Sequence, residues 1–154
     1  MPDPPFEPAA AHKWFAIELN NSSWGLLEKT DRTADEDDDL IHGAHASCFH
    51  WKKAGNHVNH SRALCLVANA YTSVGLGSAA LQFANRCVEM IESNSDDFED
   101  WDIAFAVDAQ ARAYLASGDQ ASADSYRAKS RELGDAIQGE EDKKVFDDWF
   151  ENWG

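Results

Sequence analysis

The sequence predicts an all-α protein of about seven helices. Apolar residues recur at helical spacing along nearly the whole chain, and no segment shows the alternation that is typical of a β-strand. Two stretches, residues 68–87 and 111–130, also carry alanine, tyrosine, glycine and alanine at the same offsets. This repeated order indicates a repeated helix–turn–helix unit, so we expect antiparallel helix hairpins packed side by side.

The individual helices follow from the apolar periodicity and from the Gly, Asn and Asp residues that interrupt it. The three prolines in the first eight residues predict an extended tail over residues 1–10, and residues 11–154 then form a single domain. Within that domain we expect helices at 11–29, 34–54, 60–75, 78–94, 100–117, 120–137 and 141–152.

Several polar residues and glycines stand where these helices begin and end. Thr33 and Glu36 have the spacing of a capping box before the second helix. Further candidate N-caps are Asn59, Ser78 and Asp119, and the glycines that should end helices are Gly55, Gly75 and Gly118.

Composition restricts the class of protein. A chain of 154 residues is long enough to bury one core, and no run of apolar residues is long enough to span a membrane. The opening "MPDPPFEPAA" lacks the basic and apolar regions of a secretory signal. The three cysteines, Cys48, Cys65 and Cys87, include no C-x-x-C pair and are interpreted as reduced core thiols. We therefore expect a cytoplasmic protein with no membrane partner.

The charge of the chain is strongly negative. Thirteen basic and 28 acidic residues give a formal net charge of −15, which repels the phosphates of DNA and RNA. Nucleic acid is therefore not expected as a partner. The acidic residues gather in runs at the starts of predicted helices, where carboxylates favour the positive end of the helix dipole.

The two repeated stretches resemble the tetratricopeptide repeat (TPR) class. The matching residues are Ala68, Tyr71, Gly75 and Ala80 in the first copy and Ala111, Tyr114, Gly118 and Ala123 in the second. The resemblance implies that the hairpins stack as a short right-handed superhelix, whose groove binds a peptide or a segment of a protein. The copies lie 43 residues apart. Because a standard repeat has about 34 residues, we expect longer helices or longer loops.

Two other stretches carry a second resemblance. "AIELNNSSW" and "HGAHASCFHWKKAGNHVNHSRAL" look similar to a family of small bacterial helical proteins with no assigned activity. That resemblance implies a helical fold and no particular function.

The segment "HGAHASCFHW" places three histidines on the second predicted helix. His45 lies on its apolar stripe and should point inward, whereas His50 is too far around the helix to join His42 and His45. Asp38, His42 and His45 are therefore a candidate divalent-metal site with an open position. The alternative is that His45 is a hydrogen-bonded residue between helices, and both interpretations stay open at this point.

A candidate ligand site lies on the expected concave face. The residues predicted to line that face are Arg62, Cys65, Asn69, Thr72, Ser73, Phe105, Asp108, Arg112 and Leu115. Arg62 and Arg112 are candidates to hold a carboxylate of the ligand, with Asn69 adding a hydrogen bond. The alternative is that these arginines pair with internal acids such as Asp108.

Two further residues belong to this candidate ligand set. His45 is expected to point toward the interior, and Asn21 stands with Asn20 where the periodicity expects apolar side chains. A buried asparagine must be hydrogen-bonded, so Asn21 either ties helices together or faces the groove.

Two functional hypotheses follow from these residues. The first is a protein- or peptide-binding adaptor without a cofactor, for which a homodimer is one option. The alternative is a small metal-dependent enzyme that uses Asp38, His42 and His45. The chain has no phosphate-binding loop and no Ser or Cys nucleophile motif, so no catalytic residue is assigned. The sequence does not identify the ligand.

Overall fold

The computed structural model describes residues 3–153, which form seven α-helices, one short 3-10 helix and no strand. The all-α prediction is confirmed. No helix in this part of the chain has the length and apolarity needed to cross a membrane. The elements are α1 (Pro8–Glu28), α2 (Ala34–Ala54), α3 (His57–Ser73), α4 (Gly77–Ser93), η1 (Ser95–Asp97), α5 (Asp100–Ala116), α6 (Gln120–Asp135) and α7 (Glu140–Glu151).

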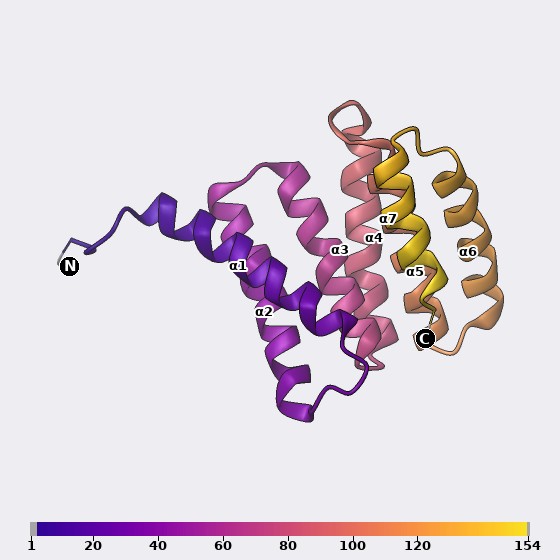
Figure 1. The fold of residues 1–154 in the computed structure, drawn as a ribbon, viewed down its shortest axis with the longest axis horizontal. Coiled ribbons are helices and arrows are strands. Elements are labelled where there is room, and N and C mark those ends of the chain that lie inside the picture. Colours follow the sequence, from indigo (N-terminus) through magenta and orange to yellow (C-terminus); the bar gives the residue numbers. More distant parts are fainter. Residues whose placement is uncertain (1–2, 154) are drawn as a thin grey trace.

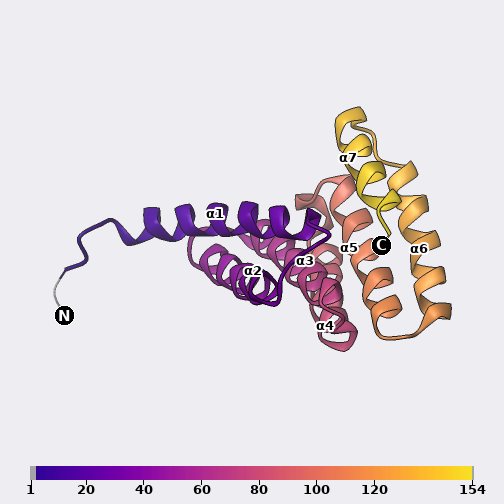
Figure 2. The same cartoon turned by 60° about the horizontal axis from the view of Figure 1, so that its bottom comes forward.

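The helices pack as three consecutive hairpins, α1 with α2, α3 with α4, and α5 with α6 (Figure 1). Helix α3 also contacts α1 and α5, so the first helices of the hairpins lie next to one another. Helix α7 packs against both helices of the last hairpin, α5 and α6 (Figure 2). The expected hairpin packing is confirmed, and the handedness of the stack stays a prediction.

Most helix boundaries lie close to the predicted ones, and their caps explain the differences. The capping box of Thr33 and Glu36 is present, and the Asp119 side chain caps α6. The N-cap of α3 is Asn56, whose side chain accepts from two backbone amides, so the prediction of Asn59 is wrong. Helix α4 follows Leu76, so the prediction of Ser78 is also wrong.

The beginning of α1 also differs from the prediction. The helix begins at Pro8, because proline is tolerated in the first turn and the Glu7 side chain accepts from the Ala9 amide. Ala9 and Ala10 are therefore helical, although they fall within the expected tail of residues 1–10. Residues 1–2 of that tail lie outside the described residues.

Small residues let the helices approach each other, and aromatic residues fill the space within each repeated hairpin. Alanines occupy three of the nine buried positions of α3 and five of the nine buried positions of α5. Tyr71 of α3 stacks on Phe83 of α4 with ring centroids 5.6 Å apart, and Tyr114 of α5 packs on Tyr126 of α6 at 5.0 Å. The repeated pattern therefore has the same structural meaning in both copies.

Two glycines of the repeated pattern end their helices as predicted. Gly75 has a φ of 79° and Gly118 a φ of 86°, a left-handed backbone conformation that glycine adopts without steric cost. The three cysteines are also as predicted, because Cys48, Cys65 and Cys87 are all buried and free.

Candidate functional site

Arg62 binds an internal carboxylate at the beginning of the α3–α5 face. Its guanidinium donates to both oxygens of Asp102, with Nε–Oδ1 at 2.8 Å and Nη2–Oδ2 at 2.9 Å. It also lies 4.3 Å above the ring of Trp101. The hydrogen bond to Asp102 raises the pKa of Arg62. Arg62 is thus held between α3 and α5, and the sequence analysis missed Asp102 as its partner.

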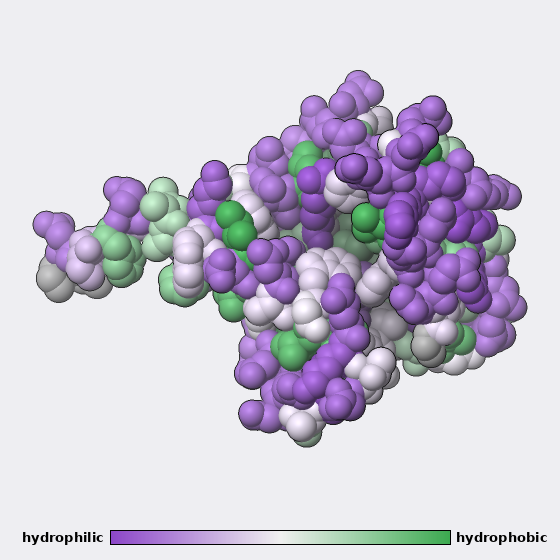
Figure 3. Space-filling model, in the orientation of Figure 1, coloured by the Kyte–Doolittle hydropathy of each residue, from purple (hydrophilic) through white to green (hydrophobic). Residues whose placement is uncertain are grey.

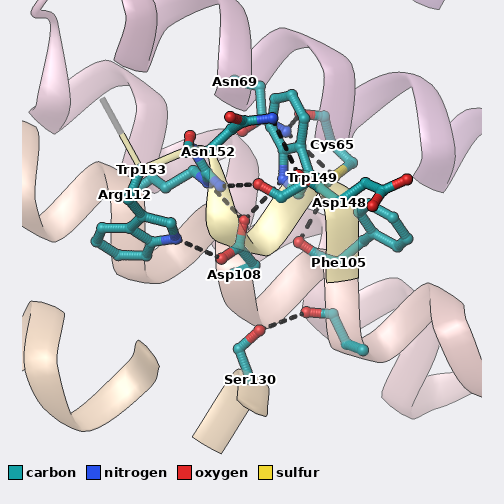
Figure 4. A network of polar contacts seen from close by, with 11 residues as sticks. Cys65, Asn69, Phe105, Asp108, Arg112, Ser130, Asp148, Trp149, Asn152 and Trp153 are labelled. Atoms are coloured by element: carbon teal, nitrogen blue, oxygen red, sulfur yellow. Dashed lines mark hydrogen bonds and ion pairs between the residues drawn. The ribbon is translucent and has the colours of Figure 1, made fainter. Parts of the chain in front are cut away.

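Asp108 is the centre of a second polar network, further along α5 (Figure 4). Its side chain is fully buried and accepts three hydrogen bonds, from Arg112 Nε at 2.6 Å, Trp149 Nε1 at 2.9 Å and Trp153 Nε1 at 3.2 Å. Burial raises the pKa of Asp108, while the charge of Arg112 opposes that change. The network binds the C-terminal helix to α5.

Arg112 holds the end of α7 through the rest of its guanidinium. Nη2 donates to the carbonyl of Trp149 at 2.8 Å, and Nη1 donates to the carbonyl of Asn152 at 3.0 Å. The guanidinium also lies 4.5 Å from the ring centroid of Trp149 and 5.1 Å from that of Trp153. Trp149 and Trp153 are four residues apart, and this spacing is a sequence signal that could have indicated the contact.

Both arginines of the predicted ligand site therefore have internal partners. The pairing of Arg112 with Asp108 is the alternative that the sequence analysis left open, and it is confirmed. Asn69 is buried and donates to the carbonyl of Cys65 at 3.1 Å. The contacts of Arg62, Asn69 and Arg112 described above are all internal to the protein. A ligand role for these three residues stays a prediction.

A hollow of about 320 Å³ lies where α3 and α5 end. It is lined by Thr72, Ser73, Gly75, Arg112, Leu115, Ala116 and Trp153. Four of these residues belong to the concave face predicted from the sequence: Thr72, Ser73, Arg112 and Leu115. The structure therefore has a hollow at one end of the predicted face, while Arg62, Asp108 and Arg112 of that face make internal contacts.

His45 is a hydrogen-bonded residue between helices. Its Nε2 lies 2.9 Å from the hydroxyl of Tyr71, and its ring packs edge-on against Tyr71 and Phe83. Burial lowers the pKa of His45, and the nearby His42 adds to that effect. His45 thus belongs to the α2–α3–α4 packing and does not line the hollow at the end of α3.

The candidate metal site does not form a cluster. Asp38 and His42 are exposed, whereas His45 uses its Nε2 for the contact with Tyr71. Among the described residues, no three His, Cys, Asp or Glu side chains are close enough to hold one metal ion. The prediction that Asp38, His42 and His45 form such a set is therefore wrong in this structure.

Asn21 is exposed on α1, so the expectation of a buried asparagine is wrong. Its side-chain oxygen accepts from Asn20 at 3.2 Å. The inward side of α1 is marked by Ala16 and Ser23, and Asn21 lies on a different side of the helix. Asn21 therefore neither ties helices together nor joins the other predicted ligand residues.

The fold and the site define an all-α protein of stacked helix hairpins that carries a small hollow at the end of its first-helix row. No protein-family model, curated protein or solved structure matches the chain. Any functional conclusion therefore depends on the geometry described above.

Proposed function

We propose that the chain is a TPR-like adaptor that binds a segment of another protein. The observation that supports this proposal is the hollow at the ends of α3 and α5, on the face where a helical-repeat protein binds its partner. Figure 3 also shows the surface hollowed between α1 and α7, next to this face. The proposed binding groove is this hollow at the ends of α3 and α5, and next to it Trp24 of α1 packs edge-on against Trp149 of α7 with ring centroids 5.3 Å apart.

The lining of the hollow indicates which part of a partner it takes. The charge of Arg112 is balanced by Asp108, and Ser73, Leu115 and Trp153 contribute a hydroxyl and two apolar surfaces. At about 320 Å³ the hollow is at the small end of the range for binding pockets, which runs from roughly 300 to 1,000 Å³. We therefore propose that it takes one or two uncharged side chains of a peptide.

The test fills the hollow and measures peptide binding. Random 16-residue peptides are selected on the wild-type protein by display, and their affinities are then measured for Leu115→Trp. We expect a loss of about tenfold or more, because the larger side chain occupies the space that a peptide side chain would take. The matched control is Val145→Trp, since Val145 is 60% exposed on α7 and does not line the hollow.

The affinities of the selected peptides for the two variants test the proposal. Peptides that lose affinity for Leu115→Trp and keep it for Val145→Trp support binding in the hollow. If no peptide is enriched, or if every enriched peptide binds Leu115→Trp as tightly as the wild type, the proposed function is wrong.

A further inference from the structure

A cluster of aromatic side chains lies where the beginning of α1 meets the end of α2. Phe15 of α1 stacks on His50 of α2 with centroids 5.4 Å apart, and Phe49 packs edge-on against the same imidazole at 5.6 Å. Trp14 packs edge-on against Phe15 at 4.9 Å. His12 joins the two helices through a hydrogen bond between its Nδ1 and that of His50 at 2.7 Å. We call these five residues the tip cluster.

The rings of the tip cluster are much more exposed than aromatic side chains usually are. Trp14 is 58% exposed, Phe15 43% and Phe49 53%. Figures 1 and 2 show that the beginning of α1 projects beyond the other helices. Figure 3 shows hydrophobic residues along the projecting end. A contiguous exposed apolar surface of this kind marks an interaction site.

The charged side chains at the α2 side of the tip cluster are basic. Residues 40–54 contain Lys52 and Lys53 and no acid, and on α1 Lys13 lies next to Trp14, between Glu7 and Glu18. Lys53 places its Nζ 5.4 Å from the ring centroid of Phe49. Among the described residues, no ion pair includes Lys13, Lys52 or Lys53.

We infer that the tip cluster docks an acidic segment of another protein that also carries aromatic or aliphatic side chains. The apolar side chains of that segment cover Trp14, Phe15 and Phe49, and its carboxylates lie against Lys52 and Lys53. Large aromatic residues are the anchors that dominate protein interfaces, and complementary charge sets the choice of partner. Lys52 and Lys53 repel basic segments, so the tip cluster discriminates against them.

The geometry favours a protein segment over an anionic membrane. Trp14 and Phe15 are successive residues of a helix, so they leave it about 100° apart and cannot both lie flat on one plane. Phe15 and Phe49 also both turn toward His50, at the junction between the two helices. A narrow segment can follow this junction, whereas a bilayer would bring its negative surface against a protein of net charge −15.

This docking surface is separate from the proposed groove. The tip cluster is formed by α1 and α2, and the hollow is formed by the ends of α3 and α5 with the C-terminal residues. The inference therefore goes beyond the proposed function, and one can be wrong without the other.

The experiment uses the same library of random 16-residue peptides on the full chain. Selected peptides are tested against two variants, Trp14→Ser/Phe49→Ser and Lys52→Glu/Lys53→Glu. We expect a group of enriched peptides rich in Asp, Glu and aromatic or aliphatic residues, with affinities at least about tenfold weaker for both variants. Their affinity should also fall as salt is raised, because exposed charges are screened.

Two matched variants act as controls elsewhere on the surface. Leu76→Ser/Val145→Ser removes two other exposed apolar side chains, and Lys129→Glu/Lys144→Glu makes the same change in net charge as Lys52→Glu/Lys53→Glu. Acidic peptides that bind both controls like the wild type support the inference. Peptides whose affinity falls only for Leu115→Trp bind in the proposed groove and not at the tip cluster.

Three results would overturn the inference. The first is a selection whose peptides are not acidic or whose affinity does not change in the tip variants. The second is sedimentation with vesicles containing phosphatidylserine that depends on Lys52 and Lys53, without acidic peptides in the selection, which would assign the tip to a membrane. The third is self-association in sedimentation velocity that Trp14→Ser/Phe49→Ser abolishes, which would assign it to a second copy of the chain.

Discussion

The two ends of this molecule use similar side chains in opposite ways. At the α5–α7 end, the guanidinium of Arg112 lies against the indoles of Trp149 and Trp153, and all three donate to the buried carboxylate of Asp108. At the α1–α2 end, Lys53 lies above Phe49, and the neighbouring Trp14 is more than half exposed. The first end has a carboxylate for its cation and the second has none among the described residues.

This difference separates contacts that stabilise the fold from an exposed surface that we infer to dock a partner. Three hydrogen bonds to the buried carboxylate of Asp108 offset part of the cost of burying its charge, and they fix α7 on α5. In the tip cluster, α1 and α2 are joined by the His12–His50 hydrogen bond and by the stacking of Phe15 on His50, and the rings of Trp14, Phe15 and Phe49 still face water. The same kinds of side chain therefore contribute differently to stability at the two ends: substitutions in the Asp108 network should lower the free energy of unfolding more than substitutions in the tip cluster.

Removal of Asp108 should give the largest effect. Asp108→Ala leaves the guanidinium of Arg112, whose side chain is only 11% exposed, and two indole N–H groups without their acceptor, so we expect the free energy of unfolding to fall by about 3–5 kcal/mol. Urea unfolding measures this loss. Asp102→Ala is the matched control, because its partner Arg62 is 40% exposed and regains water. A loss below about 1 kcal/mol for Asp108→Ala would contradict the assignment of this network to the fold.

The two repeated tyrosines should differ less, and in a definite order. Tyr71 stacks on Phe83, binds His45 and packs against the main core, so Tyr71→Ala should cost about 3 kcal/mol. Tyr114 packs mainly on Tyr126, so Tyr114→Ala should cost about 1–2 kcal/mol. Thermal or urea unfolding of the two variants checks the order, and equal losses would contradict it.

These tyrosines also show how much of the structure the sequence predicts. Helical periodicity and the repeated Tyr71 and Tyr114 patterns locate the helices and the hairpins, because both signals are local. The ion pairs of Arg62 and Arg112 differ in sequence separation. Asp108 lies four residues from Arg112, and the sequence predicts this pair as one alternative. Asp102 lies 40 residues from Arg62, and the sequence does not predict that pair. Local spacing predicts the first contact, and only the packing of α3 on α5 produces the second.

The errors have a similar origin. The periodicity predicts an apolar, buried position at Asn21, yet the apolar residues Trp14 and Ile17 of the same helix are exposed, so apolar periodicity does not mark the core there. The set Asp38, His42 and His45 shares one helix, but His45 turns toward Tyr71 on α3. Tertiary contacts decide both cases, and a single sequence does not contain them.

A smaller effect is expected from pH. Burial lowers the pKa of His45 in the folded state below its unfolded value of about 6.5, so the folded state favours the neutral imidazole. Its contribution to stability is complete above pH 6.5 and is lost as the pH falls toward the folded pKa. We expect the free energy of unfolding to decrease from pH 7 to pH 5, and to decrease less steeply in His45→Asn.

Urea unfolding at several pH values tests this expectation. The slope that remains in the variant comes in part from His50 and His60, whose pKa values are also lowered by burial. An identical slope in the wild type and in His45→Asn would contradict a role for the His45 imidazole.

The most direct test of the contrast between the two ends is urea unfolding of Trp14→Ala and Trp149→Ala under the same conditions. Both variants remove an indole that lies near a cationic side chain or an aromatic ring. The account predicts a loss of about 2–4 kcal/mol for Trp149→Ala, which breaks the Asp108 network, and of less than about 0.5 kcal/mol for Trp14→Ala. Equal losses, or a larger loss for Trp14→Ala, would show that the tip cluster stabilises the fold and is not kept for a partner.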